Sequence, residues 1–162
     1  MTESTIIPIK DSVAENAWVD ETKYFKMYEQ SVSDPEGFWK EQAKRIHWMK
    51  PFTKVKDVHF GADDVQIRWF YDGTTNAAYN CIDRHLDTKR DETAIIWEGD
   101  DPKDSKHISY GELHEEVSRL GNALKDLGVK KGDRVTIYMP MIPEAAYAML
   151  CLLYTSPSPR DS

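Results

Sequence analysis

The sequence has little cysteine and no excess of basic side chains. It contains two cysteines in 162 residues, too few for a disulfide framework or a cysteine-based metal cluster. Its 28 acidic and 21 basic side chains give a net charge of −7, and the lysines and arginines are spread along the chain. This distribution argues against a nucleic-acid-binding surface.

The sequence also lacks a long apolar run. No stretch approaches the ~20 consecutive apolar residues that a membrane-spanning helix requires. The opening Met-Thr-Glu-Ser-Thr has neither the basic start nor the apolar centre of a secretion signal. We therefore expect no membrane partner and a cytoplasmic location.

What is present is enough apolar material for a folded core, since 40% of the residues are hydrophobic and 11% are aromatic. Residues 1–20 show no sustained period and are expected to form a flexible arm. From Glu21, apolar residues recur at helical spacing. Ser33-Asp-Pro-Glu36 predicts the start of a second helix, capped by Ser33 or Asp34. The alternation in residues 65–70 predicts a half-buried strand.

The middle of the chain predicts a helix and two strands. The helix runs from Thr74 to about Leu86 and buries Ala78, Ile82 and Leu86. Cys81 is expected to be a small core residue on that helix. Residues 93–97 predict one strand and the residues around 107–108 another, joined by an acidic turn at 98–102.

The best-defined element is a helix that begins with the capping-box pattern Ser109-Tyr-Gly-Glu112 and ends before Gly128. Residues 134–139 alternate as a strand, and Pro143 begins another helix. This order predicts an α/β fold whose sheet continues beyond residue 150. One apolar stripe follows the first of these helices: Leu113, Val117, Leu120, Leu124 and Leu127.

Residues 151–162 are expected to break the last helix, because they contain two prolines and three serines. A back-translation of residues 151–161 resembles the adapter of transposase-based sequencing libraries. We therefore interpret 151–162 as a non-native tail and leave it out of the fold.

Few residues suggest chemistry on their own, and no catalytic, cofactor-binding or metal-binding residue is assigned. Asp83-Arg84-His85 places three polar groups together, but neighbouring helical positions point in different directions. The acidic side chains of residues 98–101 lack the spacing of a calcium loop. Gly132 stands without the spaced glycines of a phosphate-binding loop. The tryptophans are interpreted as packing residues.

Several consecutive segments resemble the N-terminal region of acetyl-coenzyme A synthetase. The resemblance runs in order from about Glu21 to Leu150 and stops at Cys151. It is specific because several runs of consecutive residues agree, and not only one short motif. The segments that carry it are 31–39, 50–57, 67–73, 76–85, 94–102 and 130–150.

The resemblance implies an AMP-forming acetate–CoA ligase, which converts ATP, acetate and CoA to acetyl-CoA, AMP and pyrophosphate through an acetyl-adenylate. ATP, coenzyme A and Mg²⁺ would serve the parent enzyme. Their binding residues would lie beyond residue 150, so the fragment itself is expected to be inactive. Residues 21–81 would form the helical N-terminal cap. Residues 82–150 would begin the large adenylation domain.

Two alternatives remain open. The chain could be a short non-catalytic binding or regulatory module derived from the ligase N-terminus. The parent ligase could also prefer propionate or another short acyl chain, because the pocket that would set chain length is not in these residues. Reading the gene past Leu150 separates the first alternative from a ligase.

Overall fold

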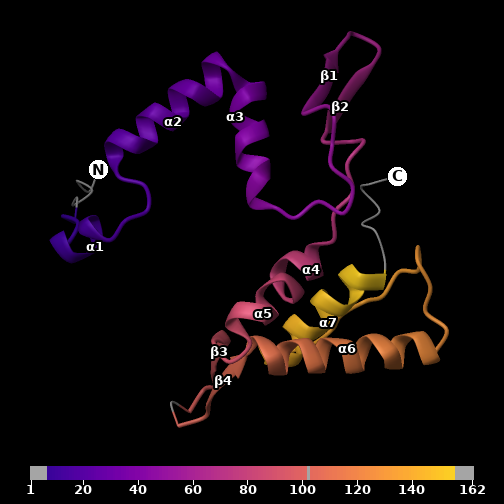
Figure 1. Cartoon of the computed structure of the whole chain (residues 1–162). Helices are drawn as coiled ribbons and strands as arrows, with labels where there is room; N and C mark the ends of the chain where they lie inside the picture. The colour runs from indigo at the N-terminus through magenta and orange to yellow at the C-terminus, as the bar shows by residue number, and fades with distance from the viewer. Residues whose placement is uncertain (1–6, 102, 156–162) are drawn as a thin grey trace, which may run out of the picture. The chain divides into compact units, whose positions relative to one another are not determined.

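The computed structural model describes residues 7–101 and 103–155 (Figure 1). Expectations that concern Met1–Ile6, Pro102 and Ser156–Ser162 lie outside the described residues. The chain divides into two compact units, which are described separately below. The first unit comprises Met1–Arg45 and Phe52–Asp72, and the second comprises Ile46–Pro51 and Gly73–Ser162.

Three helices open the first unit: α1 (Asp11–Glu15), α2 (Glu21–Ser33) and α3 (Pro35–Gln42). The start of α2 at Glu21 is confirmed, and the Asp20 carboxylate caps it by accepting from the Lys23 amide at 2.7 Å. Helix α1 was not expected, because its few residues show no repeated apolar spacing.

The cap of α3 is Asp34, whose carboxylate accepts from the Gly37 amide at 3.0 Å. Ser33, the other candidate cap, instead donates its hydroxyl to the Glu29 carbonyl one turn earlier in α2. Pro35 stands in the first turn of α3, where its missing N–H removes no helical hydrogen bond. A short 3-10 helix, η1 (Ala43–Arg45), follows α3.

Strands β1 (Lys56–Phe60) and β2 (Val65–Trp69) pair antiparallel as a two-stranded ribbon (Figure 1). The expected strand at 65–70 is confirmed as β2, although its apolar side chains are largely exposed. Strand β1 was missed, because only Val58 and Phe60 are strongly apolar within it. It is a strand because it hydrogen-bonds to β2, and its own sequence pattern does not reveal that pairing.

Aromatic contacts link α3 to the ribbon in the first unit. The Trp39 and Trp69 rings meet edge-on with centroids 5.9 Å apart, and the Phe52 and Phe70 centroids lie 4.8 Å apart. Phe70 adopts a left-handed backbone with φ 50°, a conformation that costs a non-glycine residue free energy. Its amide donates to the Val55 carbonyl at 2.8 Å, and this bond holds the turn in place.

The second unit begins with three short helical segments instead of the single helix expected from 74 to 86. They are α4 (Ala77–Cys81), η2 (Asp83–His85) and α5 (Leu86–Lys89). The break occurs at Ile82, whose φ of −124° and ψ of −72° are not helical. Tertiary packing explains the break, because it leaves the Ile82 side chain fully buried.

The expected burial of Ala78 and Ile82 is confirmed, Leu86 is only half-buried, and the expectation for Cys81 is wrong. Ala78 and Ile82 are both 0% exposed, whereas Cys81 is exposed. Successive helical residues point about 100° apart. The inward position of this turn therefore belongs to Ala78 and Ile82, and the thiol of Cys81 points to solvent.

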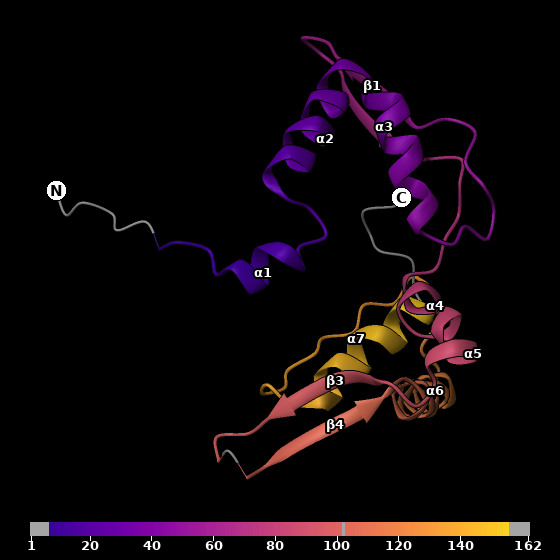
Figure 2. The same ribbon diagram turned by 60° about the vertical axis from the view of Figure 1, so that its left-hand side comes forward.

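Strands β3 (Thr93–Glu98) and β4 (Ser105–Ser109) form an antiparallel hairpin that leads into α6 (Tyr110–Asp126) (Figure 2). Both strands and the helix were predicted. Helix α6 ends as expected, with Gly128 at φ +86°. The Gly128 amide donates to the Lys125 carbonyl and the Val129 amide to the Leu124 carbonyl, which is the Schellman pattern.

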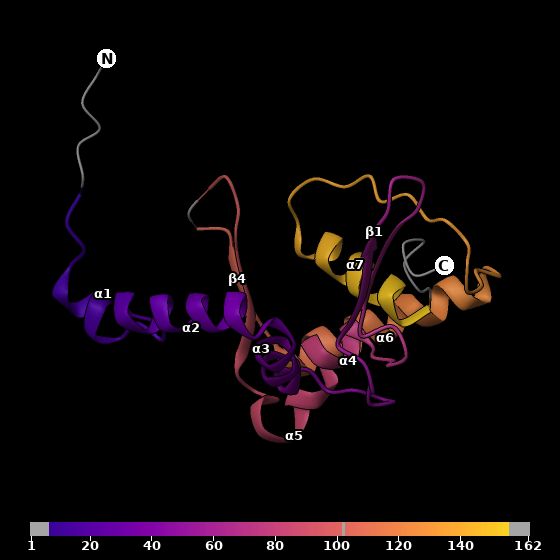
Figure 3. The ribbon, with the colours of Figure 1, turned by 90° about the horizontal axis from the view of Figure 1, so that it is seen from above.

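Residues 134–139 form no strand, so that expectation is wrong. Figure 3 shows the chain from the end of α6 to α7 as a long open loop. The side chains of Val135, Tyr138 and Met139 are 39%, 99% and 48% exposed. A strand is stable only when its backbone pairs with a neighbour, and the described part of the chain provides none for this segment.

The final helix, α7 (Pro143–Thr155), lies along α6 (Figure 1). Its start at Pro143 is confirmed, but the expected break at Cys151 is wrong. Cys151 is fully buried and belongs to the core of the second unit. The non-native origin of residues 151–162 stays a prediction. The buried members of that core are Ile82, Ile108, Leu113, Val117 and Cys151.

Candidate functional site

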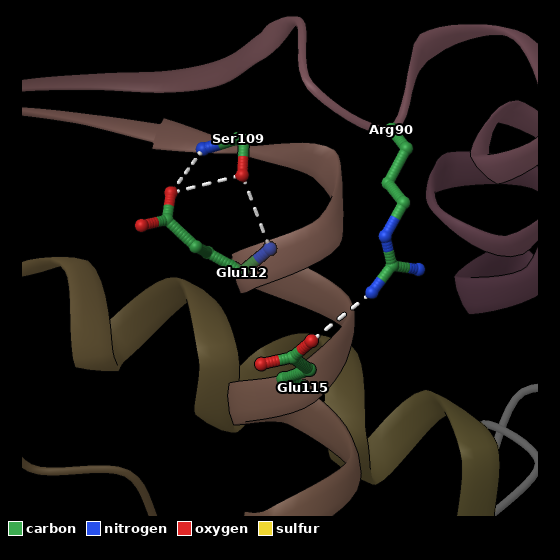
Figure 4. Close-up of polar contacts among 4 residues, drawn as sticks. All are labelled: Arg90, Ser109, Glu112 and Glu115. Carbon is green, nitrogen blue, oxygen red and sulfur yellow. Dashed lines mark hydrogen bonds and ion pairs between the residues drawn. The ribbon is translucent and has the colours of Figure 1, made fainter.

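The first polar cluster lies where β4 meets α6 (Figure 4). The Ser109 hydroxyl accepts from the Glu112 amide at 3.2 Å, and the Glu112 carboxylate accepts from the Ser109 amide at 2.8 Å. These bonds form the predicted capping box. The hydrogen bond from the Ser109 amide, followed by the one from its hydroxyl, lowers the pKa of Glu112.

Arg90 and Glu115 form an ion pair beside this capping box, with Nη2 and Oε1 3.1 Å apart (Figure 4). Both side chains are more than half exposed, and exposed pairs of this kind contribute little to stability. The cluster therefore fixes the entry into α6 and offers no activated nucleophile.

Replacing Ser109 by alanine is expected to lower the free energy of unfolding by about 1 kcal/mol, because α6 loses its N-cap acceptor. Ser109→Thr is the matched control, since it keeps a hydroxyl at the cap. Urea unfolding of the two variants at neutral pH measures the difference. Equal midpoints would show that Ser109 does not cap α6 in solution.

A second cluster surrounds Asp72 at the end of the ribbon. The Thr53 amide donates to both carboxylate oxygens of Asp72, at 3.0 and 2.9 Å, and the Thr53 hydroxyl donates to the same group. The hydroxyl bond is the main cause that lowers the pKa of Asp72 below its ordinary value of 3.8. Nearby, a hydrogen bond with Tyr71 raises the pKa of Lys54.

The Asp72 cluster is expected to weaken in acid. Because the folded state lowers the pKa of Asp72, its stabilisation is complete above the unfolded pKa near 3.8 and is lost as the pH falls through the folded value. Asp72→Asn should therefore be less stable than the wild type at pH 7, and the difference should shrink at pH 3. Asp63→Asn, in the exposed turn between β1 and β2, is the control. Urea midpoints of the wild type and both variants at the two pH values measure the stability difference. The same difference between Asp72→Asn and the wild type at pH 7 and at pH 3 would contradict the predicted pH dependence.

The first unit also contains a pocket of about 560 Å³. Its lysines can neutralise an anion, and it contains neither histidine nor cysteine. It is lined by Glu36, Gly37, Lys40, Phe52, Thr53, Lys54, Val55 and Lys56.

The polar run at 83–85 does not converge on one point. Asp83 Oδ1 lies 3.6 Å from His114 Nε2, and Arg84 donates to the Asn80 side chain at 2.9 Å. The His85 ring lies against the Tyr110 ring, with centroids 5.3 Å apart. The Asp83–His114 pair was not anticipated, because no local sequence signal joins residues so far apart.

The acidic turn between β3 and β4 is closed by its own backbone. The Gly99 amide donates to the Asp104 carbonyl at 2.7 Å, and the Asp101 side chain accepts from the Lys103 amide at 3.0 Å. Across residues 7–101 and 103–155, no group of three His, Cys, Asp or Glu side chains is arranged to hold a metal ion. Gly132, at φ +96°, is a single left-handed turn residue.

The tryptophans on β2 and β3 contact other parts of their own units. Besides the Trp39–Trp69 contact, the Trp97 indole donates to the Met141 carbonyl at 2.8 Å and fixes the open loop against β3. The Lys106 ammonium lies 5.7 Å from the Trp97 ring centroid. Trp18, by contrast, is 85% exposed.

Backbone amides at four helix starts are already bonded to side chains. Helices α2, α3, α4 and α6 begin with a side-chain oxygen that accepts from a first-turn amide. Such amides are the usual phosphate ligands of a helix N-terminus.

None of the helices within the described ranges is both long and apolar enough to cross a membrane.

Comparison with known proteins identifies both parts of the chain. Residues 24–81 match the family "Acetyl-coenzyme A synthetase N-terminus", and residues 82–156 match "AMP-binding enzyme". Acetyl-coenzyme A synthetase of Methylorubrum extorquens is 62% identical over 145 residues, which are 90% of this chain and 22% of the relative. The same enzyme of Bradyrhizobium diazoefficiens is 64% identical over 137 residues, which are 85% of this chain and 21% of the relative.

A solved structure has the same fold. Acetoacetyl-CoA synthetase from Streptomyces lividans matches 92% of this chain with a TM-score of 0.70 and 28% identity, and the match covers 24% of that protein. The chain thus spans about a fifth of the length of the relatives that it matches. By sequence and by fold, it belongs to the acetyl-coenzyme A synthetase family of adenylate-forming ligases, as a segment from their N-terminal part.

Proposed function

We propose that the chain is part of an AMP-forming acetate–CoA ligase, which makes acetyl-CoA, AMP and pyrophosphate from ATP, acetate and CoA. The observation that carries this proposal is the identity of 62% over 145 residues to an acetyl-coenzyme A synthetase. The alignment covers 90% of the chain, so it is not a short shared motif. In the complete enzyme, Mg²⁺ would offset the phosphate charge of ATP, and the reaction would take place in the cytoplasm.

The residues that would hold ATP, CoA and Mg²⁺ are proposed to lie outside this segment. Two observations support this proposal. One first-turn amide in each of four helices is already bonded to a capping side chain, and no group of three metal-ligating side chains comes together within the described ranges. We therefore derive no catalytic step from these residues. Their role in the proposed enzyme is structural, with residues 21–81 as the N-terminal cap and 82–150 as the beginning of the adenylation domain.

The test is to express the complete gene from source DNA and to measure ATP–pyrophosphate exchange with acetate, propionate and butyrate. Acetate should give the highest kcat/KM, because the sequence relatives are acetyl-coenzyme A synthetases. A preference for propionate would keep the ligase and change its substrate. Exchange with none of the acids would overturn the proposal.

Sequencing the same locus past Leu150 tests the short-module alternative and the proposed non-native tail together. We expect the reading frame to continue from Leu150 with codons different from those of residues 151–162. A genomic sequence that encodes these twelve residues followed by a stop would favour a short binding or regulatory module.

A further inference from the structure

The peptide linkage between Asp72 and Gly73 is of a chemically labile kind. The Gly73 backbone nitrogen can attack the side-chain Cγ of Asp72 and expel one water molecule, which closes a five-membered succinimide ring. A second water molecule then opens the ring at either carbonyl. Opening at the side-chain carbonyl restores aspartate, and opening at the main-chain carbonyl gives isoaspartate, so the mass of the chain does not change.

This pair is the only Asp–Gly or Asn–Gly pair in the sequence. Glycine favours ring closure, because it has no Cβ to hinder the attack and leaves the backbone free to turn. Asp72 and Gly73 are both half-buried, so water reaches the linkage. Isoaspartate would lengthen the main chain by one carbon and leave the carboxylate directly on Cα. The change would fall where the chain passes from the first unit to the second.

The folded chain opposes the first step of this reaction. The carboxylate of Asp72 accepts from the Thr53 amide through both oxygens, at 3.0 and 2.9 Å, from the Thr53 hydroxyl, and from the Lys54 amide at 3.4 Å. Ring closure removes one of these oxygens as water, so at least one bond from the Thr53 amide must be broken. The backbone two residues later is also held, because Thr74 and Lys50 exchange two main-chain hydrogen bonds of 3.0 and 3.1 Å.

The charge of the carboxylate adds to this effect. An ionised carboxylate resists attack, because its oxygen can leave as water only after protonation. Hydrogen bonds to the ionised form stabilise that form, and the bond from the Thr53 hydroxyl is the largest cause that lowers the pKa of Asp72. Thr53 therefore keeps the carboxyl group of Asp72 in its unreactive state as well as in place.

We propose that Asp72–Gly73 is a site of isoaspartate formation in this protein and that Thr53 suppresses the modification in the folded chain. Thr53 acts as a positioning residue, since it holds the carboxylate and contributes no atom to the reaction. The inference is independent of the proposed function, because it uses only the contacts of residues 50–74. Its failure would leave the proposed ligase unchanged.

The test measures isoaspartate at residue 72 in the 162-residue chain during prolonged incubation, folded and in urea, at pH 7 and at pH 3. Peptides with aspartate or isoaspartate have equal mass, so they are separated by chromatography and identified by electron-transfer fragmentation. Thr53→Val removes the hydroxyl donor and keeps a branched side chain, and Thr53→Ser is the matched control that keeps a hydroxyl. Asp34→Ala is a second control, because it removes the cap of α3 in the same unit and leaves Thr53 in place.

At pH 7, we expect the wild type to form isoaspartate at least about tenfold faster in urea than when folded, because unfolding removes all the charge-assisted bonds. In the folded chain, Thr53→Val should raise the rate about threefold or more, whereas Thr53→Ser and Asp34→Ala should stay within about twofold of the wild type. The effect of Thr53→Val should shrink at pH 3, because more of the carboxyl group is then protonated in both chains.

Absence of isoaspartate at residue 72 in urea would overturn the proposed site. Equal rates for the wild type folded and in urea would overturn the protection, and this comparison decides it even if Thr53→Val does not fold. An equal rise in Asp34→Ala and Thr53→Val would point to general loosening of the first unit and would overturn the role of Thr53. A Thr53→Val effect of the same size at both pH values would contradict protection through the ionised carboxylate.

Discussion

The 162-residue chain alone is expected to give no acetate-dependent ATP–pyrophosphate exchange above a no-protein blank. The reason is that the residues that would bind ATP and acetate are proposed to lie beyond residue 150. One first-turn amide in each of α2, α3, α4 and α6 is already bonded to a capping side chain, which reduces the donors that these helix starts offer to a phosphate. Enzymes accelerate reactions by at least about 10⁶-fold through positioned groups, so loss of the site should abolish measurable exchange.

The assay uses the purified chain with acetate, MgATP and labelled pyrophosphate, with the complete ligase as the positive control. Activity that survives repurification of the chain would contradict the expectation. The Asp83–His114 pair would then be the first group to examine, because it joins a carboxylate and an imidazole at 3.6 Å. Asp83→Asn should abolish such activity if this pair were its source.

The second large effect is expected from Ile82→Ala, which should lower the free energy of unfolding by about 2–5 kcal/mol. Ile82 is 0% exposed and packs in one cluster with Leu113 and Val117 of α6. Truncating its side chain removes buried apolar area and leaves a cavity between the short helices and α6. Such a loss is a large part of the ~5–15 kcal/mol that a typical domain has in total.

Urea unfolding followed by tryptophan fluorescence measures the effect. Ile96→Ala is the matched control, because the same side chain is 69% exposed on β3 of the same unit. It should change the free energy of unfolding by no more than about 0.5 kcal/mol. Comparable losses in the two variants would mean that Ile82 is not a core residue in solution.

Local interactions specify the elements that were predicted correctly from the residues. The capping box of Ser109 and Glu112 and the left-handed Gly128 depend on groups within a few residues of one another. Such features can therefore be read directly from the residues. The family resemblance could also be recognised from the sequence, because it rests on matching runs of consecutive residues.

Other features depend on partners that are distant in the sequence, and these were not predicted. Strand β1 exists through hydrogen bonds to β2, and the expected strand at 134–139 is absent because the described chain supplies no neighbour for it. Packing of Ile82 against α6 breaks the predicted helix and turns Cys81 outward. Periodicity indicates which side chains can be buried together, but the partner that buries them is set by contacts far away in the sequence.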